Sequence, residues 1–473
     1  MKRDLLRTSA LWSRGLILAL LNVSLVALFI EYAHAMTFAK TYGGIYVDWA
    51  RFVQQTSDGG YIVAGGTSSF GAGSYDFFLI KTDAFGNVQW AKTYGGTDYD
   101  DARSVQQTSD GGYVVTGYTY SFGAGLSDVF LVKTDASGNI QWAKTYGGTG
   151  YDFASSVQQT SDGGYIVTGT TYSFGEGGDI FLIKTDANGN VQWAKTYGGT
   201  DYEFASSIQQ TSDGGYILAG LTSSFGAGSY DFFLIKTDAF GNVQWAKTYG
   251  EAGGEGASSI QQTSDGGYIL AGGTLSFGAG GSDIFLIKTD ANGNVIWAKT
   301  YGGTNSDYAF SVQQTSDGGY ILTGYTYSFG AGNEDIILIK TDANGNIIWA
   351  KTYGGTGYDA AYSVQQTSDG GYILAGYTAS FGAGSLDFFL IKTDANGNIG
   401  SCSIVQNASP TETTPSPTVN TPPPSVSSPS FTVNSVSPTI AYPILTVSEP
   451  CPLSISESCQ ITSGLITPYK GGI

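Results

Sequence analysis

The chain has 473 residues, of which 21 are basic and 39 acidic, so its formal net charge at pH 7 is −18. A charge of this sign and size disfavours nucleic acids and anionic membrane surfaces as partners. The single histidine is His34, so a Ser-His-Asp triad, a Cys-His pair and a His-ligated metal are excluded from the rest of the chain.

Residues 1–35 have the pattern of a secretory signal peptide. An apolar stretch runs from about residue 15 to residue 30, a small-residue cleavage site follows at 33–35, and four basic residues precede both: Lys2, Arg3, Arg7 and Arg14. We therefore expect a secreted or cell-surface protein. The alternative is an uncleaved N-terminal anchor, which would be the one contact with a membrane, because the apolar run is only slightly short for a span.

The motif Ser-Asp-Gly-Gly-Tyr recurs seven times, at intervals of 51 or 52 residues. The copies begin at Ser57, Ser109, Ser161, Ser212, Ser264, Ser316 and Ser368. A fixed period of this length indicates an array of supersecondary units.

Each copy contains four segments with strand character. In the second copy they are 104–108, 113–119, 129–134 and 139–146, which are rich in β-branched and aromatic residues and bounded by Gly, Asp, Asn and Ser. No proline precedes Pro410, as expected for hydrogen-bonded inner strands. Four antiparallel strands in a repeat of about 50 residues are typical of propeller blades.

The sequence thus predicts an all-β, seven-bladed β-propeller over residues 36–400. The segment beginning at Phe38 resembles a fourth strand with no blade before it, and the last copy lacks its own fourth strand after Asn398. We expect the N-terminal strand to complete the last blade, which closes the ring and removes an exposed edge. The structural alternative, a solenoid, would need capping repeats.

Residues 401–473 differ in composition. All twelve prolines lie between Pro410 and Pro468, among Ser, Thr and Val. Such a segment buries too little apolar surface to order itself, so we expect a disordered stalk or linker. The three cysteines are Cys402, Cys451 and Cys459. In an exported protein Cys451 and Cys459 are expected to pair, which leaves Cys402 without a partner.

One position before each innermost strand is always acidic: Asp48, Asp100, Asp152, Glu203, Glu255, Asp307 and Asp359. Each carboxylate is expected either to accept N–H bonds in its own turn or to belong to a calcium-binding ring at the channel mouth. A second acidic set starts each third strand: Asp76, Asp128, Asp179, Asp231, Asp283, Asp335 and Asp387. No other cofactor is indicated.

The repeats diverge on the face that carries the inter-blade loops, and uneven aromatic residues there suggest a surface for a sugar or a peptide. The candidate ligand-binding residues are Trp49, Arg51, Phe153, Phe204, Tyr308, Phe310 and Tyr362. The alternative is drift at positions under weak packing constraint.

The motifs Trp-Ala-Lys-Thr-Tyr-Gly-Gly, Gln-Gln-Thr-Ser-Asp-Gly-Gly-Tyr and Ser-Phe-Gly-Ala-Gly resemble repetitive β-propeller proteins of exported bacterial and archaeal origin, over residues 37–398. The pattern Lys-Thr-Asp-Ala-x-Gly-Asn also looks like quinoprotein-type blades, whose calcium and quinone ligands have no counterpart in this sequence. The Ser-Asp-Gly-Gly turn is similar to the Asp-box of sialidases, but with the wrong spacing.

We expect a monomeric binding scaffold on the cell surface or outside the cell, with a glycan or a protein as its ligand and no catalytic residues. The first alternative is a purely structural envelope or matrix protein. The second is a hydrolase or lyase that uses carboxylates alone, because no histidine follows residue 34.

Overall fold

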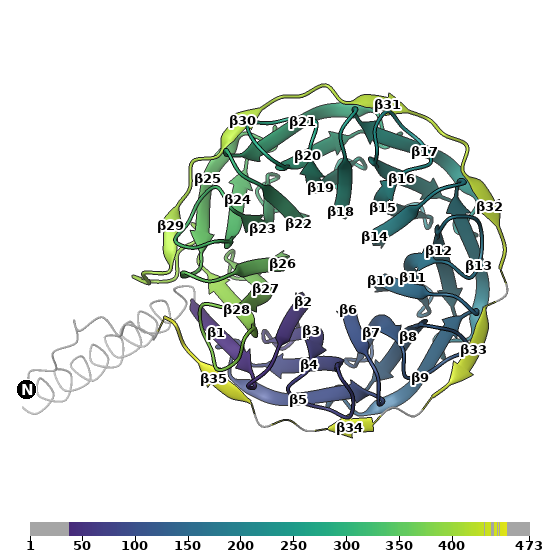
Figure 1. The fold of residues 1–473 in the computed structure, drawn as a ribbon, viewed down its shortest axis with the longest axis horizontal. Coiled ribbons are helices and arrows are strands. Elements are labelled where there is room, and N and C mark those ends of the chain that lie inside the picture. Colours follow the sequence, from purple (N-terminus) through teal and green to yellow (C-terminus); the bar gives the residue numbers. More distant parts are fainter. Residues whose placement is uncertain (1–36, 430, 437–438, 442, 444, 452–473) are drawn as a thin grey trace, which may run out of the picture.

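In the computed structural model the described residues are 37–429, 431–436, 439–441, 443 and 445–451. They form seven β-sheets arranged as blades around a central channel, as Figure 1 shows. The predicted signal peptide and Cys459 lie outside these residues. Within them, no helix is long and apolar enough to cross a membrane.

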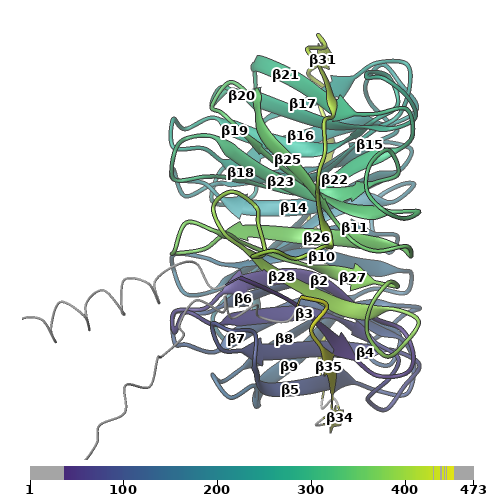
Figure 2. The same cartoon turned by 90° about the vertical axis from the view of Figure 1, so that its left-hand side faces the viewer.

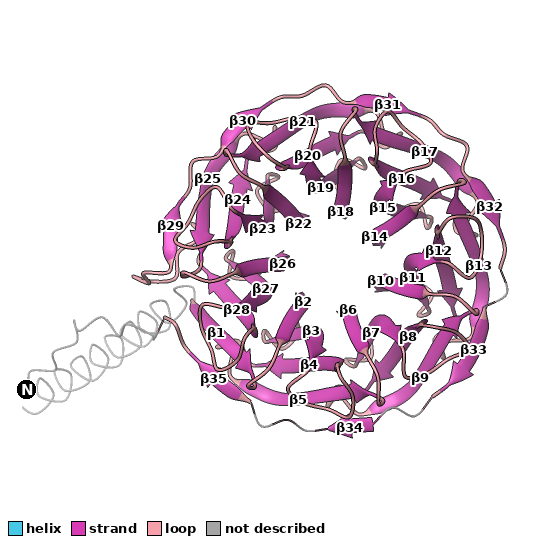
Figure 3. Cartoon of the chain, viewed as in Figure 1, coloured by secondary structure: helices cyan, strands magenta, loops and turns pink. Residues whose placement is uncertain are grey.

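Each blade takes four antiparallel strands from the repeats, and Figure 3 shows strands and loops throughout. The innermost strands are β2 (Asp48–Gln55), β6 (Asp100–Gln107), β10 (Asp152–Gln159), β14 (Glu203–Gln210), β18 (Glu255–Gln262), β22 (Asp307–Gln314) and β26 (Asp359–Gln366). The second strands are β3 (Tyr61–Thr67), β7 (Tyr113–Thr119), β11 (Tyr165–Thr171), β15 (Tyr216–Thr222), β19 (Tyr268–Thr274), β23 (Tyr320–Thr326) and β27 (Tyr372–Thr378).

The third strands are β4 (Asp76–Thr82), β8 (Asp128–Thr134), β12 (Asp179–Thr185), β16 (Asp231–Thr237), β20 (Asp283–Thr289), β24 (Asp335–Thr341) and β28 (Asp387–Thr393). The fourth strands are β5 (Val88–Gly95), β9 (Ile140–Gly147), β13 (Val191–Gly198), β17 (Val243–Gly250), β21 (Val295–Gly302), β25 (Ile347–Tyr353) and β1 (Phe38–Gly43). The all-β fold with seven blades of four antiparallel strands is therefore confirmed.

Ring closure is also confirmed. Strand β1 pairs antiparallel with β28, placing Phe38 opposite Lys392 and Tyr42 opposite Phe388. The last blade is thus built from both ends of the propeller domain. This pairing covers an edge of β28 that would otherwise be open to another chain.

The repeated polar motifs tie turns to strands and blades to each other. In the first blade Lys81, on β4, forms an ion pair of 2.9 Å with Asp58 of the Ser-Asp-Gly-Gly turn, and its Nζ also donates to the carbonyl of Thr82. From the same blade the hydroxyl of Tyr94, on β5, donates to the carbonyl of Gly138 in the next blade, at 2.7 Å. Equivalent bonds recur around the ring, which explains why these motifs are repeated.

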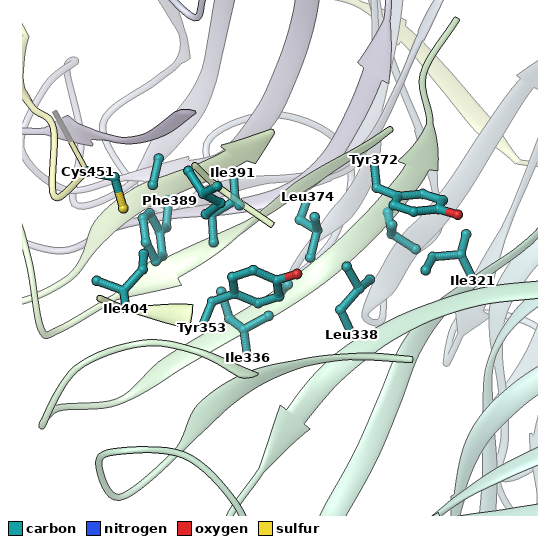
Figure 4. Packing of buried hydrophobic residues seen from close by; sticks show 14 residues of the cluster. Ile321, Ile336, Leu338, Tyr353, Tyr372, Leu374, Phe389, Ile391, Ile404 and Cys451 are labelled. Carbon is teal, nitrogen blue, oxygen red and sulfur yellow. The ribbon is translucent and has the colours of Figure 1, made fainter. Parts of the chain in front are cut away.

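The hydrophobic core is divided into seven clusters, each formed where two neighbouring blades face each other. Figure 4 shows the cluster between the sixth and seventh blades, with Leu338 and Tyr353 packed against Leu374 and Phe389. Burial of this apolar area, at roughly 25 cal/mol per Å², holds the blades together. Cys451 lies at one end of the same cluster.

The described residues between 401 and 451 encircle the propeller, and we call this segment the belt (Figures 1 and 2). It adds a short fifth strand to the outer edge of every blade and runs opposite to the order of the repeats. Its strands are β29 (Val405–Asn407) on β25, β30 (Thr411–Thr413) on β21, β31 (Thr418–Asn420) on β17, β32 (Ser425–Ser427) on β13, β33 (Thr432–Ser435) on β9, β34 (Thr439–Ala441) on β5 and β35 (Thr446–Ser448) on β1.

A disulfide between Cys402 and Cys451, with Cα atoms 5.4 Å apart, joins the two ends of the belt. The expected pairing of Cys451 with Cys459 is therefore wrong, because the belt returns to its starting blade and brings two distant cysteines together. The belt also differs from the expected free stalk over residues 401–451. Its composition prevents a core of its own, but the seven blades supply strand edges on which it orders.

Candidate functional site

The two faces of the ring differ in their loops. One face carries the uniform turns between first and second and between third and fourth strands, and we call it the turn face. The other carries the loops between second and third strands and between blades, and we call it the loop face. The innermost strands begin at the loop face, so their first residues surround the channel entrance on that side.

A β-bulge near the start of each innermost strand aims one residue into the channel. In the first blade Ala50 pairs with Gly65 and Phe52 with Ala64, which leaves Arg51 as the extra residue. The same register shift occurs in every blade. Bulges of this kind leave one residue unpaired and re-aim its side chain. We call the seven bulge residues the mouth: Arg51, Arg103, Ser155, Ser206, Ser258, Phe310 and Tyr362.

The mouth lines a cavity of about 270 Å³, together with Phe204 and the residues one position deeper. At that deeper level Phe52 takes the place that serine holds in the other six blades. The wall is uneven, because at the bulge the first, second, sixth and seventh blades contribute cations and aromatic rings, whereas the third, fourth and fifth contribute serines, with Phe204 of the fourth blade as one further ring. One side can stack on a flat apolar surface, and the other offers hydroxyl groups.

The two arginines of the mouth have different partners. Arg103 Nε lies 2.9 Å from Asp101 Oδ2, and Arg103 Nη2 donates to the Tyr118 hydroxyl. Arg51 instead lies over aromatic rings, with its guanidinium carbon 4.3 Å from the Tyr362 ring and 5.7 Å from the Trp49 ring. Its Nε is buried and has no hydrogen-bond partner. No carboxylate among the described residues forms an ion pair with Arg51, so its positive charge is unpaired.

Four of the seven candidate ligand-binding residues line the cavity: Arg51, Phe204, Phe310 and Tyr362. Trp49, Phe153 and Tyr308 do not. Trp49 supports Arg51 and donates from Nε1 to Asp101. Tyr308 fills space left by two glycines, since a Cβ on Gly273 would lie 2.2 Å from its ring and its hydroxyl donates to the Gly256 carbonyl.

Phe153 belongs to a second group of aromatic residues, which lies on the loop face beside the mouth. Its ring lies 4.9 Å from that of Tyr118, and Tyr118 stacks on Tyr99 at 5.8 Å. Tyr75 connects Tyr99 to Trp49, with ring centroids 4.7 and 4.8 Å away. The aromatic surface thus extends from the mouth over the first three blades. That these tyrosines form one surface was not predicted from the sequence.

The first acidic set caps loops. Asp48 accepts hydrogen bonds from the Gly44 N–H and the hydroxyls of Ser69 and Thr67, and its side chain is fully buried. Among the described residues no three His, Cys, Asp or Glu side chains gather as a metal site. The structure does not bring Asp48, Asp100, Asp152, Glu203, Glu255, Asp307 and Asp359 together, so the geometry favours the loop-cap hypothesis over a calcium ring.

The second acidic set meets the first at every blade junction. A Cβ added to Gly95 would lie 1.9 Å from Asp76 Oδ1 and 2.7 Å from Asp100 Oδ2, so only glycine fits between the two carboxylates. Asp76 Oδ1 is buried without a hydrogen-bond partner. Burial and the neighbouring Asp100 raise the pKa of Asp76 to about 6. Burial and Glu203 raise the pKa of Asp179 to about 7 at its junction.

A family model described as holdfast attachment protein D matches residues 124–375, which is more than half of the chain. The regulatory protein FlaEY of Caulobacter vibrioides is 24% identical over 383 residues, which cover 67% of this chain and 39% of that protein. An uncharacterised WD repeat-containing protein of Acanthamoeba polyphaga mimivirus is 22% identical over 404 residues, covering 69% of this chain and 27% of that protein. The chain thus spans less than half the length of these curated relatives.

Among solved structures, Sqt1 from Chaetomium thermophilum has a TM-score of 0.43 at 11% identity, covering 72% of this chain and 82% of its own. A puromycin hydrolase has a TM-score of 0.48 at 13% identity, covering 76% of this chain and 54% of its own. Neither likeness carries a functional argument. The family model matches from the loop before β8, in the second blade, into β27, in the seventh, which is more than half of the chain, and on that match the chain belongs to the holdfast attachment protein D family.

Proposed function

We propose that the protein is a surface-displayed or secreted binding scaffold for attachment, which holds a glycan or a protein at the mouth of its channel. The family description supports a role in attachment. The propeller supplies a rigid frame, and the belt covers the outer edges of its blades. The mouth is one of the parts of this frame where the blades differ.

One observation carries the proposal. Seven bulges with the same geometry present seven side chains, and the side chains are unequal: two arginines and two aromatic residues on one side, three serines on the other. A frame without a ligand would need no such asymmetry. An aromatic and cationic wall facing hydroxyl groups is the composition of a small-molecule site, in which a few polar groups fix orientation.

The experiment is a glycan array and a protein-binding screen with the full chain and two variants. Phe310→Ser combined with Tyr362→Ser introduces the residue that three other blades carry at this bulge, so the fold is expected to tolerate it. The control is Phe240→Asn, which removes an exposed ring from the turn face and introduces the residue of four other copies.

The double variant is expected to lose binding at least tenfold, because an aromatic stacking contact is worth about 0.5–1.5 kcal/mol beyond its area burial. The control is expected to bind like the wild type. Equal loss in both variants, or unchanged binding in the double variant, would place the ligand elsewhere on the molecule.

A further inference from the structure

We infer that the mouth recognises an acidic sugar, whose carboxylate pairs with Arg51; this rests on the proposed function and names the class of ligand. The starting point is the isolation of Arg51. Its Nε is buried with no acceptor, and in the described part of the chain it forms no ion pair. A buried donor without a partner is unfavourable, and an anionic ligand would supply the missing acceptor.

Arg103 provides an internal comparison. It occupies the same bulge in the next blade, yet its guanidinium is paired with the fully buried Asp101 at 2.9 Å. The first blade has Trp49 at the position of Asp101, so Arg51 has an aromatic ring where Arg103 has a carboxylate. The same frame therefore holds one neutralised arginine and one available arginine.

The residues around Arg51 fix the position of its guanidinium group without neutralising its charge. The guanidinium carbon of Arg51 lies over the Tyr362 ring, 4.3 Å from its centroid. The Phe310 ring packs on the Tyr362 ring, with centroids 4.5 Å apart. Stacking on a ring satisfies none of the N–H groups of the guanidinium. Guanidinium N–H groups are the ones that pair with a carboxylate through two parallel hydrogen bonds.

The cavity size selects a small occupant. Its volume of about 270 Å³ lies just below the roughly 300–1,000 Å³ that is typical of sites for drug-sized ligands. One terminal sugar unit fits this space better than a folded protein segment. Its apolar ring face would stack on Tyr362 or Phe310, and Ser155, Ser206 and Ser258 would meet its hydroxyl groups.

The charge of the chain argues for a single carboxylate and against a polyanion. The net charge is −18, so the surrounding field repels an extended anionic chain. A single carboxylate that reaches Arg51 loses contact with water but gains a cation at close range. Further acidic groups of a longer ligand would instead lie near the acidic surface of the protein, which repels them.

The test is calorimetric titration of the full chain with galacturonic-acid-terminated and neutral galactose-terminated disaccharides. The variants are Arg51→Ser, which introduces the residue of three other blades at this bulge, and Arg51→Lys, which keeps the charge without the planar fork. Phe240→Asn is the control, and a melting curve checks the fold of each variant.

Wild type is expected to prefer the acidic disaccharide by about tenfold or more, as for a hydrogen bond to a charged group. Arg51→Ser should abolish the preference, so that both disaccharides bind with similar affinity, and Arg51→Lys should restore part of the preference. A higher salt concentration should reduce the preference.

If the wild type binds both disaccharides with equal affinity, and Arg51→Ser does not alter that affinity, the inference of an acidic ligand is refuted. The proposed function as a binding scaffold would still stand. Binding of neither disaccharide, together with Arg51-dependent binding of a short peptide through its C-terminal carboxylate, would assign the site to a peptide and refute the inference. An absence of any ligand for the wild type in the array, the protein screen and these titrations would overturn both the inference and the proposed function.

Discussion

The disulfide between Cys402 and Cys451 makes the belt a covalently closed loop around the propeller, and its removal has a calculable effect. The two cysteines are 49 residues apart in sequence, and all seven belt strands lie between them. In the chain-entropy model, opening a loop of this length costs about 4 kcal/mol of the free energy of unfolding at 25 °C. The variant is Cys402→Ser combined with Cys451→Ser.

The corresponding change in melting temperature follows from the size of the domain. Unfolding entropy is about 2.1 cal/mol/K per residue, so roughly 400 ordered residues give a decrease of about 5 °C. The belt should also leave the blades before the ring unfolds, because each of its strands pairs over only three or four residues. Limited proteolysis should therefore cut the variant first within residues 401–451 and leave the propeller intact.

Differential scanning calorimetry measures the first effect, and mass spectrometry of the protease fragments measures the second. Cys459→Ser is the matched control and should melt like the wild type. The reasoning is refuted if Cys459→Ser lowers the melting temperature as much as the double variant does, or if non-reduced peptides show Cys451 joined to Cys459.

Three further predictions concern the ring. Deleting Phe38–Gly43 removes β1 and exposes an edge of β28, so solubility and melting temperature should fall; a variant that melts like the parent would contradict ring closure. Carboxyl groups with raised folded pKa bind protons more tightly in the folded than in the unfolded state, so stability should decrease as the pH rises from about 4 to about 7. Moving the pKa of Asp76 from 3.8 to about 6 corresponds to about 3 kcal/mol. Asp179→Asn removes one of these groups and should make the pH dependence of the melting temperature shallower; an unchanged profile would show that Asp179 does not titrate in this window. Below about pH 4 the opposite trend is expected as the turn carboxylates protonate, because the hydrogen bond from Thr108 and the ion pair with Lys133 lower the pKa of Asp110 to about 2 despite partial burial. Millimolar calcium should leave the melting temperature unchanged, because the first acidic set already accepts bonds from its own loops; a rise that is abolished when Asp100, Asp152 and Asp359 are all changed to asparagine would support the calcium hypothesis instead.

The fold could be predicted because the period of 51 or 52 residues repeats every strand and turn signal seven times. The belt could not. Arguments from composition describe what a segment does alone, and residues 401–451 order only against the outer strands of the blades. The cysteine pairing was wrong for the same reason, because proximity in sequence says nothing about a segment that returns to its starting blade.

The candidate site could be predicted in part. The variable positions pointed to the innermost strands, and Arg51, Phe310 and Tyr362 do reach the cavity. The bulge that aims them inward was missed, because the expected strand in the second copy began at Ser104 whereas β6 begins at Asp100. Polar residues at the start of that strand hid its true length. An eight-residue strand opposite a seven-residue partner is the signal that would have revealed the bulge.

Co-crystallisation of the full chain with the preferred disaccharide tests the central claim most directly. The account predicts density for one sugar unit inside the mouth, with its carboxylate within hydrogen-bond distance of Arg51 and its ring against Tyr362 or Phe310. Density on the turn face or on the belt, with an empty mouth, would contradict it.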